Sequence, residues 1–81
     1  MTSKDFQALS GSEQYALTMA SGVKIAEREN PCFHMTLYRL GAFHVEIKRQ
    51  IADGEEWVGL IDHDILLVPY LDQIKIDGLL P

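Results

Sequence analysis

The chain has 81 residues, of which 47% are hydrophobic and 23% charged, and this length supports one hydrophobic core but not two. Its 12 Asp and Glu against 7 Lys and Arg give a formal net charge of −5 without a basic stripe, which argues against binding to a nucleic-acid backbone. No apolar stretch approaches the roughly 20 residues of a membrane-spanning helix, and the single cysteine cannot form an internal disulfide. We therefore expect one domain over residues 1–81, in the cytoplasm and away from the membrane.

A helix is predicted to begin at Ser10, because Ser10 and Glu13 have the capping-box spacing in which each side chain accepts a hydrogen bond from the other residue's amide. Downstream, apolar residues recur at steps of three and four and predict a stripe that faces the core: Tyr15, Ala16, Met19, Ala20, Val23 and Ala26. Gly22 lies inside this pattern and indicates either a close packing contact or a bend. Asn30-Pro31 is predicted to end the helix, because proline lacks an amide proton and disfavours a helical residue before it.

Two stretches, residues 32–39 and 42–51, alternate apolar and polar side chains as half-buried strands do. Asp53-Gly54 is typical of a two-residue type I′ hairpin loop that leads to a third strand. The pairs that this loop implies are Ile51 with Glu56, Arg49 with Val58 and Ile47 with Leu60. In this register four apolar residues share one face and are expected to lie under the helix: Val45, Ile47, Val58 and Leu60.

The loop of the first hairpin has two candidate lengths. A two-residue loop at Leu40-Gly41 would set Leu37 opposite His44, which pairs an apolar residue with a polar one. A three-residue loop over residues 40–42 avoids this mismatch. The pairs that the longer loop gives, and that we predict, are Leu37 with Val45 and Met35 with Ile47.

The C-terminal segment is predicted to form a short helix that starts near Pro69, because proline suits a first helical turn. A fourth strand over residues 65–68 is the alternative. The apolar residues near the end are expected to lie against the body of the protein or a partner: Ile76, Leu79 and Leu80. The predicted fold is therefore α+β, with an N-terminal amphipathic helix packed on a three-stranded antiparallel β-meander and a short C-terminal helix or fourth strand.

Several short motifs occur in a fixed order along most of the chain. They are a helix with Gly22 near its centre and Ala26-Glu27-Arg28 at its end, then Leu37-Tyr38, Phe43-His44-Val45-Glu46-Ile47 and Pro69-Tyr70-Leu71-Asp72-Gln73-Ile74. This order resembles a group of small uncharacterised bacterial proteins. The resemblance implies a stand-alone helix-plus-meander domain, and it transfers no activity and no functional residue.

The three histidines are the first candidates for a metal site. His44 lies near Glu46 on the polar side of the predicted sheet, and such neighbours can bind a divalent metal. However, His34 would lie opposite Lys48, and His63 follows the end of the strand. Three converging ligands are therefore not expected, and we predict no metal and no cofactor.

Catalytic motifs are not evident in the sequence, which has no nucleophile elbow, no phosphate-binding glycine loop and no pair of histidines at zinc-protease spacing. Cys32 is expected to be a half-buried small residue, since no neighbour is predicted to lower the pKa of its thiol. The carboxylate pairs are expected to flank turns or cap elements. These pairs are Glu55 with Glu56, and Asp62 with Asp64.

The polar side of the predicted sheet carries the candidate interaction surface, which mixes aromatic, imidazole and charged groups. Its residues are Thr36, Tyr38, His44, Glu46, Lys48, Gln50, Trp57 and Ile61. The alternative interpretation is that this side is simply solvated. We predict a non-catalytic protein-interaction module that acts through its sheet face or an edge strand on an unknown protein partner or on a second copy of itself. A small-molecule-binding protein with a pocket around Tyr38, Trp57 and Tyr70 is the second hypothesis, and an enzyme ranks third.

Overall fold

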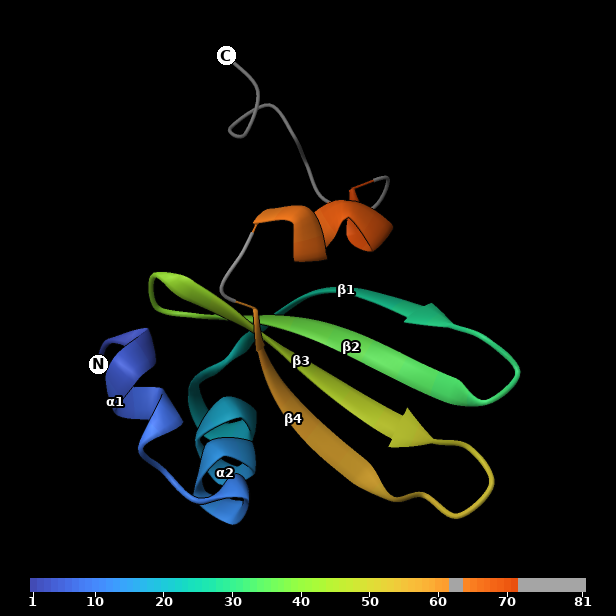
Figure 1. Cartoon of the computed structure of the whole chain (residues 1–81), viewed down its shortest axis with the longest axis horizontal. Coiled ribbons are helices and arrows are strands. Elements are labelled where there is room, and N and C mark those ends of the chain that lie inside the picture. Colours follow the sequence, from blue (N-terminus) through green and yellow to red (C-terminus); the bar gives the residue numbers. More distant parts are fainter. Residues whose placement is uncertain (62–63, 72–81) are drawn as a thin grey trace.

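The computed structural model of the chain describes residues 1–61 and 64–71 and has the predicted α+β architecture (Figure 1). In chain order its elements are helices α1 (Ser3–Gln7) and α2 (Gly11–Ser21), strands β1 (Val23–Glu29), β2 (Phe33–Leu40), β3 (Phe43–Gln50) and β4 (Glu56–Ile61), and the 3₁₀ helix η1 (Asp64–Tyr70). The strands form one antiparallel sheet in the order β1-β2-β3-β4. The meander therefore has one strand more than predicted, and the added strand, β1, lies at its edge.

Capping boxes start both α-helices. In α2 the Ser10 hydroxyl accepts from the Glu13 amide at 3.2 Å and the Glu13 carboxylate accepts from the Ser10 amide at 3.0 Å, which confirms the predicted start. Helix α1, which is not predicted from the sequence, begins in the same way with Thr2 and Asp5, at 3.1 Å for each bond. The hydrogen bonds from the Thr2 and Ser10 amides lower the pKa of Asp5 and of Glu13, respectively.

The predicted helix is too long, because α2 ends just before Gly22 and residues 23–29 form strand β1. Gly22 has extended backbone angles, φ −73° and ψ 145°, and a Cβ atom built on it would lie 2.5 Å from the Thr18 carbonyl oxygen. The residues that follow include Val23 and Ile25, whose β-branched side chains favour strands. Gly22 therefore marks the bend at which helix changes to strand.

Asn30-Pro31 forms a hairpin turn between β1 and β2 and not the end of a helix. The Asn30 side-chain oxygen accepts from the amides of Cys32 and Phe33, both at 2.8 Å, and the Asn30 amide donates to the Phe33 carbonyl at 2.9 Å. Asparagine followed by proline is typical of the first two positions of a type I turn. Cys32 is exposed in this turn, so the expectation of a half-buried cysteine is wrong.

Strands β2 and β3 are joined by the two-residue loop Gly41-Ala42, since Leu40 pairs with Phe43, and the predicted three-residue loop is wrong. Gly41 has a φ of 64°, which glycine adopts without strain at the first position of a tight hairpin loop. The shorter loop changes the register of the strands. The observed pairs are Tyr38 with Val45 and Thr36 with Ile47, in place of Leu37 with Val45 and Met35 with Ile47.

This shift by one residue moves every side chain of β2 to the face opposite the predicted one. Thr36 and Tyr38 lie on the same face as Val45, whereas Met35 and Leu37 lie on the other. The alternation of β2 misled the prediction because its central residues are buried on both sides of the sheet. We call the side with Val45 and Ile47 the helix face, and the side with Leu37 and Glu46 the η1 face.

The hairpin between β3 and β4 has a longer loop than predicted, because the Gln50 amide donates to the Glu55 carbonyl at 2.8 Å. Gly54 has a φ of 74° and donates to the Gln50 carbonyl at 2.8 Å, while Asp53 keeps a negative φ and its carboxylate accepts from the Glu55 amide. The prediction of a two-residue type I′ loop is therefore wrong. The observed pairs are Arg49 with Glu56, Ile47 with Val58 and Val45 with Leu60. Since this register differs by two residues from the predicted one, each side chain keeps its predicted face.

The main core lies between the helices and the helix face. Its buried residues are Phe6, Leu40, Phe43, Val45 and Ile47, with Leu9, Tyr15, Leu17, Tyr38, Val58 and Leu60 packed against them. Burial of the apolar side of β3 and β4 beneath the helices is thus confirmed. The predicted stripe of α2 is only partly correct, because Tyr15 packs on the core while Ala16 and Ala20 are exposed and Met19 is 43% exposed.

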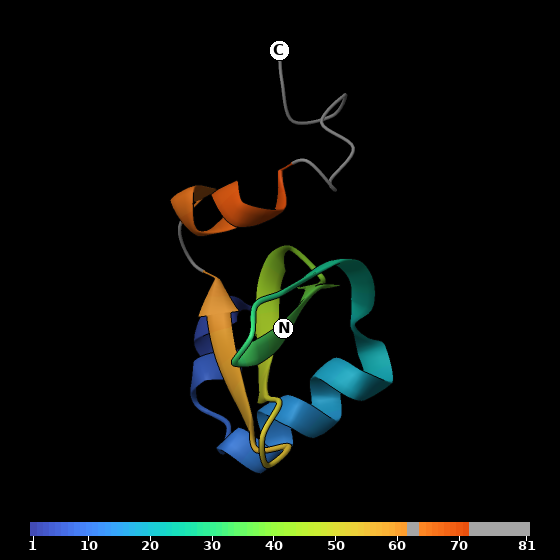
Figure 2. The same cartoon turned by 90° about the vertical axis from the view of Figure 1, so that its right-hand side faces the viewer.

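Helix η1 lies on the other side of the sheet from α2 (Figures 1 and 2). Tyr70 is completely buried there against Ala26 and Leu37, with Ile25, Ile61 and Leu67 packed around them. The C-terminal segment is therefore helical over residues 64–70, with Pro69 near the end of the helix, so the predicted start near Pro69 is wrong, as is the alternative of a fourth strand over residues 65–68. The predicted packing of Ile76, Leu79 and Leu80 falls outside the described residues.

Candidate functional site

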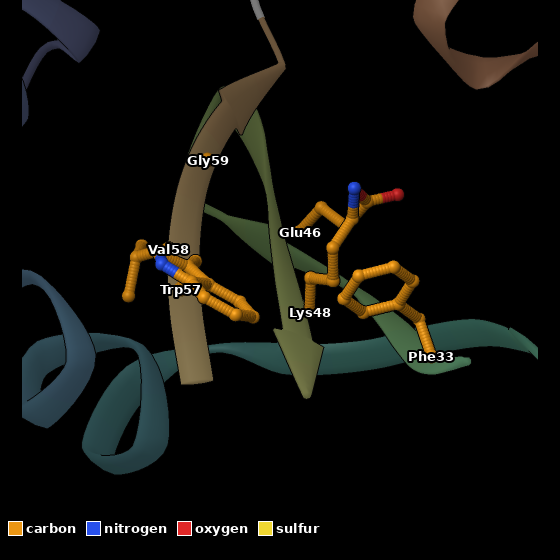
Figure 3. Close-up of a pocket in the computed structure, with 6 residues that line it drawn as sticks. All are labelled: Phe33, Glu46, Lys48, Trp57, Val58 and Gly59. Atoms are coloured by element: carbon orange, nitrogen blue, oxygen red, sulfur yellow. The ribbon is translucent and has the colours of Figure 1, made fainter. Parts of the chain in front are cut away.

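Helix η1 covers only one end of the η1 face, and a cavity of about 350 Å³ lies on the rest of it. We call it the aromatic groove, and its lining residues are Phe33, Glu46, Lys48, Trp57, Val58 and Gly59 (Figure 3). The pairing Lys48 with Trp57 and Glu46 with Gly59 brings β3 and β4 together at this point. The groove is therefore built by neighbouring positions of the meander and not by a flexible loop.

Two aromatic rings form the walls of the aromatic groove. Phe33 and Trp57 lie on the same side of the sheet and flank β3, with ring centroids 6.1 Å apart in an edge-to-face arrangement (Figure 3). The Lys48 ammonium lies 5.0 Å from the centre of the Phe33 ring, a cation–π distance. The Trp57 side chain nevertheless remains 43% exposed, so a large apolar surface in the groove faces solvent.

Gly59 makes the groove hollow. Its neighbours on β4 of the same face are Trp57 and Ile61, and among the described residues a Cβ atom added at Gly59 would meet only the Glu46 carbonyl oxygen, at 3.9 Å. Glycine is unfavourable within strands and often marks a place where another group approaches the backbone. The space above Gly59 could therefore hold a side chain of a ligand or partner.

Glu46 is fixed at the edge of the aromatic groove by residues under η1. The Tyr70 hydroxyl donates to the Glu46 carboxylate at 2.5 Å, and the Arg28 guanidinium lies 4.0 Å from the same oxygen. Burial, followed by the bond to Glu46, raises the pKa of Tyr70, so this hydroxyl stays protonated and remains a donor at neutral pH. The Glu46 carboxylate therefore already has a hydrogen-bond partner and a nearby positive charge, which hold its side chain in place in the wall of the groove.

The eight predicted interaction residues are divided between the two faces of the sheet. Six belong to the η1 face: His44, Glu46, Lys48, Gln50, Trp57 and Ile61. Of these, Glu46, Lys48 and Trp57 line the aromatic groove, whereas Ile61 packs beside η1. Thr36 and Tyr38 lie on the helix face because of the register of β2. Phe33 and Gly59 belong to the groove and are not among the predicted residues.

The hypothetical pocket around Tyr38, Trp57 and Tyr70 does not form as one cavity. Tyr38 packs on the helix side, Trp57 lies in the aromatic groove, and Tyr70 is completely buried beneath η1. Trp57 also borders a second cavity, of about 510 Å³, at the edge of β4 beside the start of α2. Its indole is therefore accessible both from the η1 face and from the edge strand.

The histidines lie apart from the aromatic groove where they are described. The ring nitrogens of His34 lie 3.2 Å from the Glu27 carboxylate and 3.1 Å from the Glu29 carboxylate, on the helix face. His44 is half-buried on β3, and His63 falls outside the described residues, as does Asp62. Within residues 1–61 and 64–71, no group of three or more His, Cys, Asp or Glu side chains is placed to hold a metal ion.

Comparisons of the chain with known proteins give no match. No protein-family model, no curated protein and no solved structure matches the chain. In the part of the chain that the structure describes, no helix has the length and apolar character needed to cross a membrane.

Proposed function

We propose that this protein is a non-catalytic interaction module that binds an apolar side chain of a partner protein in the aromatic groove. The observation that carries this proposal is Trp57, which is 43% exposed beside the side-chain-free position of Gly59. Tryptophan is among the residues that contribute most to protein interfaces, because it buries a large rigid surface. A partner side chain over Gly59 would remove this surface from water.

The chemistry of the aromatic groove supports binding over catalysis. Its six described lining residues supply one ammonium group and one carboxylate, and the carboxylate already accepts from Tyr70. They supply no hydroxyl, thiol or imidazole that could act as a nucleophile beside a base. The exposed Cys32 thiol suits a reducing compartment, and we place the protein in the cytoplasm as part of this proposal.

The partner is proposed to be a polypeptide that crosses the edge of β4. The cavity at this edge adjoins the aromatic groove, since Trp57 and Val58 line both. A chain seated over Gly59 can therefore continue past the outer side of β4, which pairs with no other strand in the part of the chain that the structure describes. The second cavity adds the side chains of Gln14 and Tyr15 from α2 to this surface.

Two variants and one control test this proposal. Trp57→Ala removes the wall of the groove, and Gly59→Val fills its floor, at a position where an added Cβ atom lies 3.9 Å from the Glu46 carbonyl oxygen. Val23→Thr is the control, because Val23 is 51% exposed on the opposite edge strand and threonine keeps its shape. Immobilised proteins are incubated with extract of the native cell, and retained proteins are quantified by mass spectrometry.

The expected result is a partner that wild type and Val23→Thr retain equally and that both groove variants lose. Truncation of a central tryptophan costs about 2 kcal/mol or more, which corresponds to an affinity about 30-fold weaker. The affinities of wild type and variants for the purified partner are then measured by isothermal calorimetry, because Trp57→Ala removes the single tryptophan of the chain and with it the fluorescence signal. Light scattering tests whether the partner is a second copy. A strictly monomeric protein with no Trp57-dependent partner would refute the proposal.

A further inference from the structure

A third cavity lies on the other side of the sheet from the aromatic groove, between α2 and the helix face. This cavity of about 250 Å³ is lined by side chains of α2 and all four strands, and we call it the polar cleft. Its lining residues include Tyr15, Thr36, Tyr38, Arg49 and Glu56. None of its described lining residues belongs to the aromatic groove, although Tyr15 and Glu56 also line the cavity at the edge of β4.

The helix face changes from apolar to polar along its strands, which explains the position of the cleft. Cross-strand rows run from Leu40 and Phe43, through Tyr38, Val45 and Leu60, then Thr36, Ile47 and Val58, to His34, Arg49 and Glu56. The helices cover the apolar rows and form the core there. Over the polar rows, α2 contributes Tyr15 and Met19, and Met19 remains 43% exposed and does not fill the space.

Thr36 places a hydroxyl group at the bottom of the polar cleft. Its residue is only 9% exposed and lines the cavity. Among the described residues, this hydroxyl has no hydrogen-bond partner. Because Thr36 lines the cavity and its hydroxyl is not a fully buried atom, that hydroxyl can form a hydrogen bond with a molecule in the cleft.

Arg49 supplies a positive charge at the mouth of the polar cleft. It pairs across the strands with His34 and Glu56, yet it forms no ion pair within 4.0 Å among the described residues. Arg49 and Glu56 both change the pKa of the Tyr15 phenol. The charge of Glu56 raises the pKa of Tyr15, with burial adding to the effect, and Arg49 partly opposes it. Arg49, Glu56 and Tyr15 therefore share one electrostatic environment.

The polar cleft is lined by two positive and two negative side chains. Lys24 and Arg49 are positive, Glu27 and Glu56 are negative, and Lys24 already contacts Glu27 at 3.0 Å. A ligand with a single net charge would leave one protein charge unmatched, whereas a ligand with both charges matches Arg49 and Glu56 together. The apolar side chains of Met19 and Ile47 provide room for a short apolar substituent.

We infer that the polar cleft binds a small zwitterion of the size of a free amino acid, with its carboxylate on Arg49 and Thr36 and its ammonium group on Glu56. Arginine binds carboxylates through two parallel hydrogen bonds, and the Thr36 hydroxyl can donate a third. The volume of the cleft suits such a ligand, because larger metabolites occupy pockets of about 300 Å³ or more. This inference does not depend on the proposed function of the aromatic groove.

The test is isothermal calorimetry of the full chain with each standard free amino acid, supplied at up to about 10 mM. We expect at least one amino acid to bind with a Kd of about 1 mM or tighter. Its N-acetyl form and its methyl ester, each of which lacks one charge, should bind at least about tenfold more weakly. Failure of every amino acid to bind would overturn the inference, as would equal binding of the blocked forms.

Variants then connect binding to the residues of the cleft. Arg49→Gln should weaken binding about tenfold, and Thr36→Val should weaken it about fivefold while its thermal midpoint stays at or above that of wild type. Arg39→Gln is the control, because Arg39 is exposed on the η1 face. Trp57→Ala should also bind as wild type does. Unchanged affinity in Arg49→Gln or Thr36→Val would overturn the inference, whatever the outcome for the aromatic groove.

Discussion

Tyr70 connects η1 to the centre of the sheet by packing and by a hydrogen bond. The residue is completely buried, its hydroxyl donates to Glu46 at 2.5 Å, and the Arg28 guanidinium lies 5.3 Å from the centre of its ring. The Glu46 side chain is only 18% exposed, so its carboxylate has little access to water. The bond to Tyr70 therefore satisfies a charge that would otherwise be costly to bury.

Replacement of Tyr70 by phenylalanine is expected to destabilise the protein by about 1–3 kcal/mol, because the ring remains while a half-buried carboxylate loses its donor. Urea unfolding followed by circular dichroism measures this change. Tyr38→Phe is the control, since the half-buried Tyr38 has no hydrogen bond from its hydroxyl to a described residue, and its change should stay below about 0.5 kcal/mol. Equal stability of Tyr70→Phe and wild type would show that the bond to Glu46 contributes nothing.

The residues of the aromatic groove differ in how clearly the sequence indicates them. Glu46, Lys48 and Trp57 follow from the strong alternation of β3 and β4, and they lie on one face as predicted. Phe33 is missed because its strand slips by one residue, which turns an expected core residue into a wall of the groove. Gly59 is missed for a different reason. Gly59 contributes space and no side chain, whereas the alternation of a strand is recognised from the apolar and polar side chains along it.

At the scale of elements, Gly22 decides where α2 ends and β1 begins. A glycine inside a helix costs about 1 kcal/mol relative to alanine, so the longer predicted helix implies that Gly22→Ala stabilises the protein. The structure implies that Gly22→Ala destabilises the protein, because the new Cβ atom would lie 2.5 Å from the Thr18 carbonyl oxygen. The substitution therefore distinguishes the two conformations by the direction of its effect.

We expect Gly22→Ala to lower the free energy of unfolding by about 1–3 kcal/mol, because backbone has to shift to admit the methyl group. Thermal unfolding and urea titration measure it. Gly11→Ala is the matched control at the other end of α2, where a Cβ atom meets nothing within 4 Å, and it should be neutral or stabilising. A stabilised Gly22→Ala would mean that the helix continues past this position.

The elements themselves show why the fold class could be predicted from the sequence while one boundary and two loops could not. The Ser10 capping box and the alternation of β3 are local signals, and both are confirmed. Asn30-Pro31 is compatible with a helix end and with a type I turn, and the pairing of Glu29 with His34 across the turn distinguishes the two. The β2 register likewise depends on what covers each face, which is a property of the assembled molecule.

One short sheet carries a core and a cavity on each of its faces, with a further cavity at the edge of β4. The helices and η1 each bury one part of opposite faces, and the aromatic groove and the polar cleft occupy the remainder. Neighbouring residues of β3 serve different sites, since Lys48 lines the groove and Arg49 lines the cleft. A small chain can therefore present two chemically distinct surfaces without a second domain, because side chains alternate across a strand.

The stability of the whole molecule is expected to fall at acidic pH. Hydrogen bonds from the Thr2 and Ser10 amides lower the pKa of Asp5 and Glu13, and the hydrogen bond from Lys24 lowers that of Glu27. A carboxylate with a lowered pKa in the folded state stabilises that state above its ordinary value, which is 3.8 for Asp5 and 4.5 for the two glutamates. This stabilisation is lost as the pH falls through the folded-state pKa, since the unfolded chain then binds protons more readily. The urea midpoint should stay level from neutral pH to about pH 5 and decline below it.

The urea midpoint of the double variant Asp5→Asn with Glu13→Gln should decline less steeply, because both capping carboxylates are gone. A midpoint that rises on acidification would show that relief of the −5 net charge outweighs these bonds.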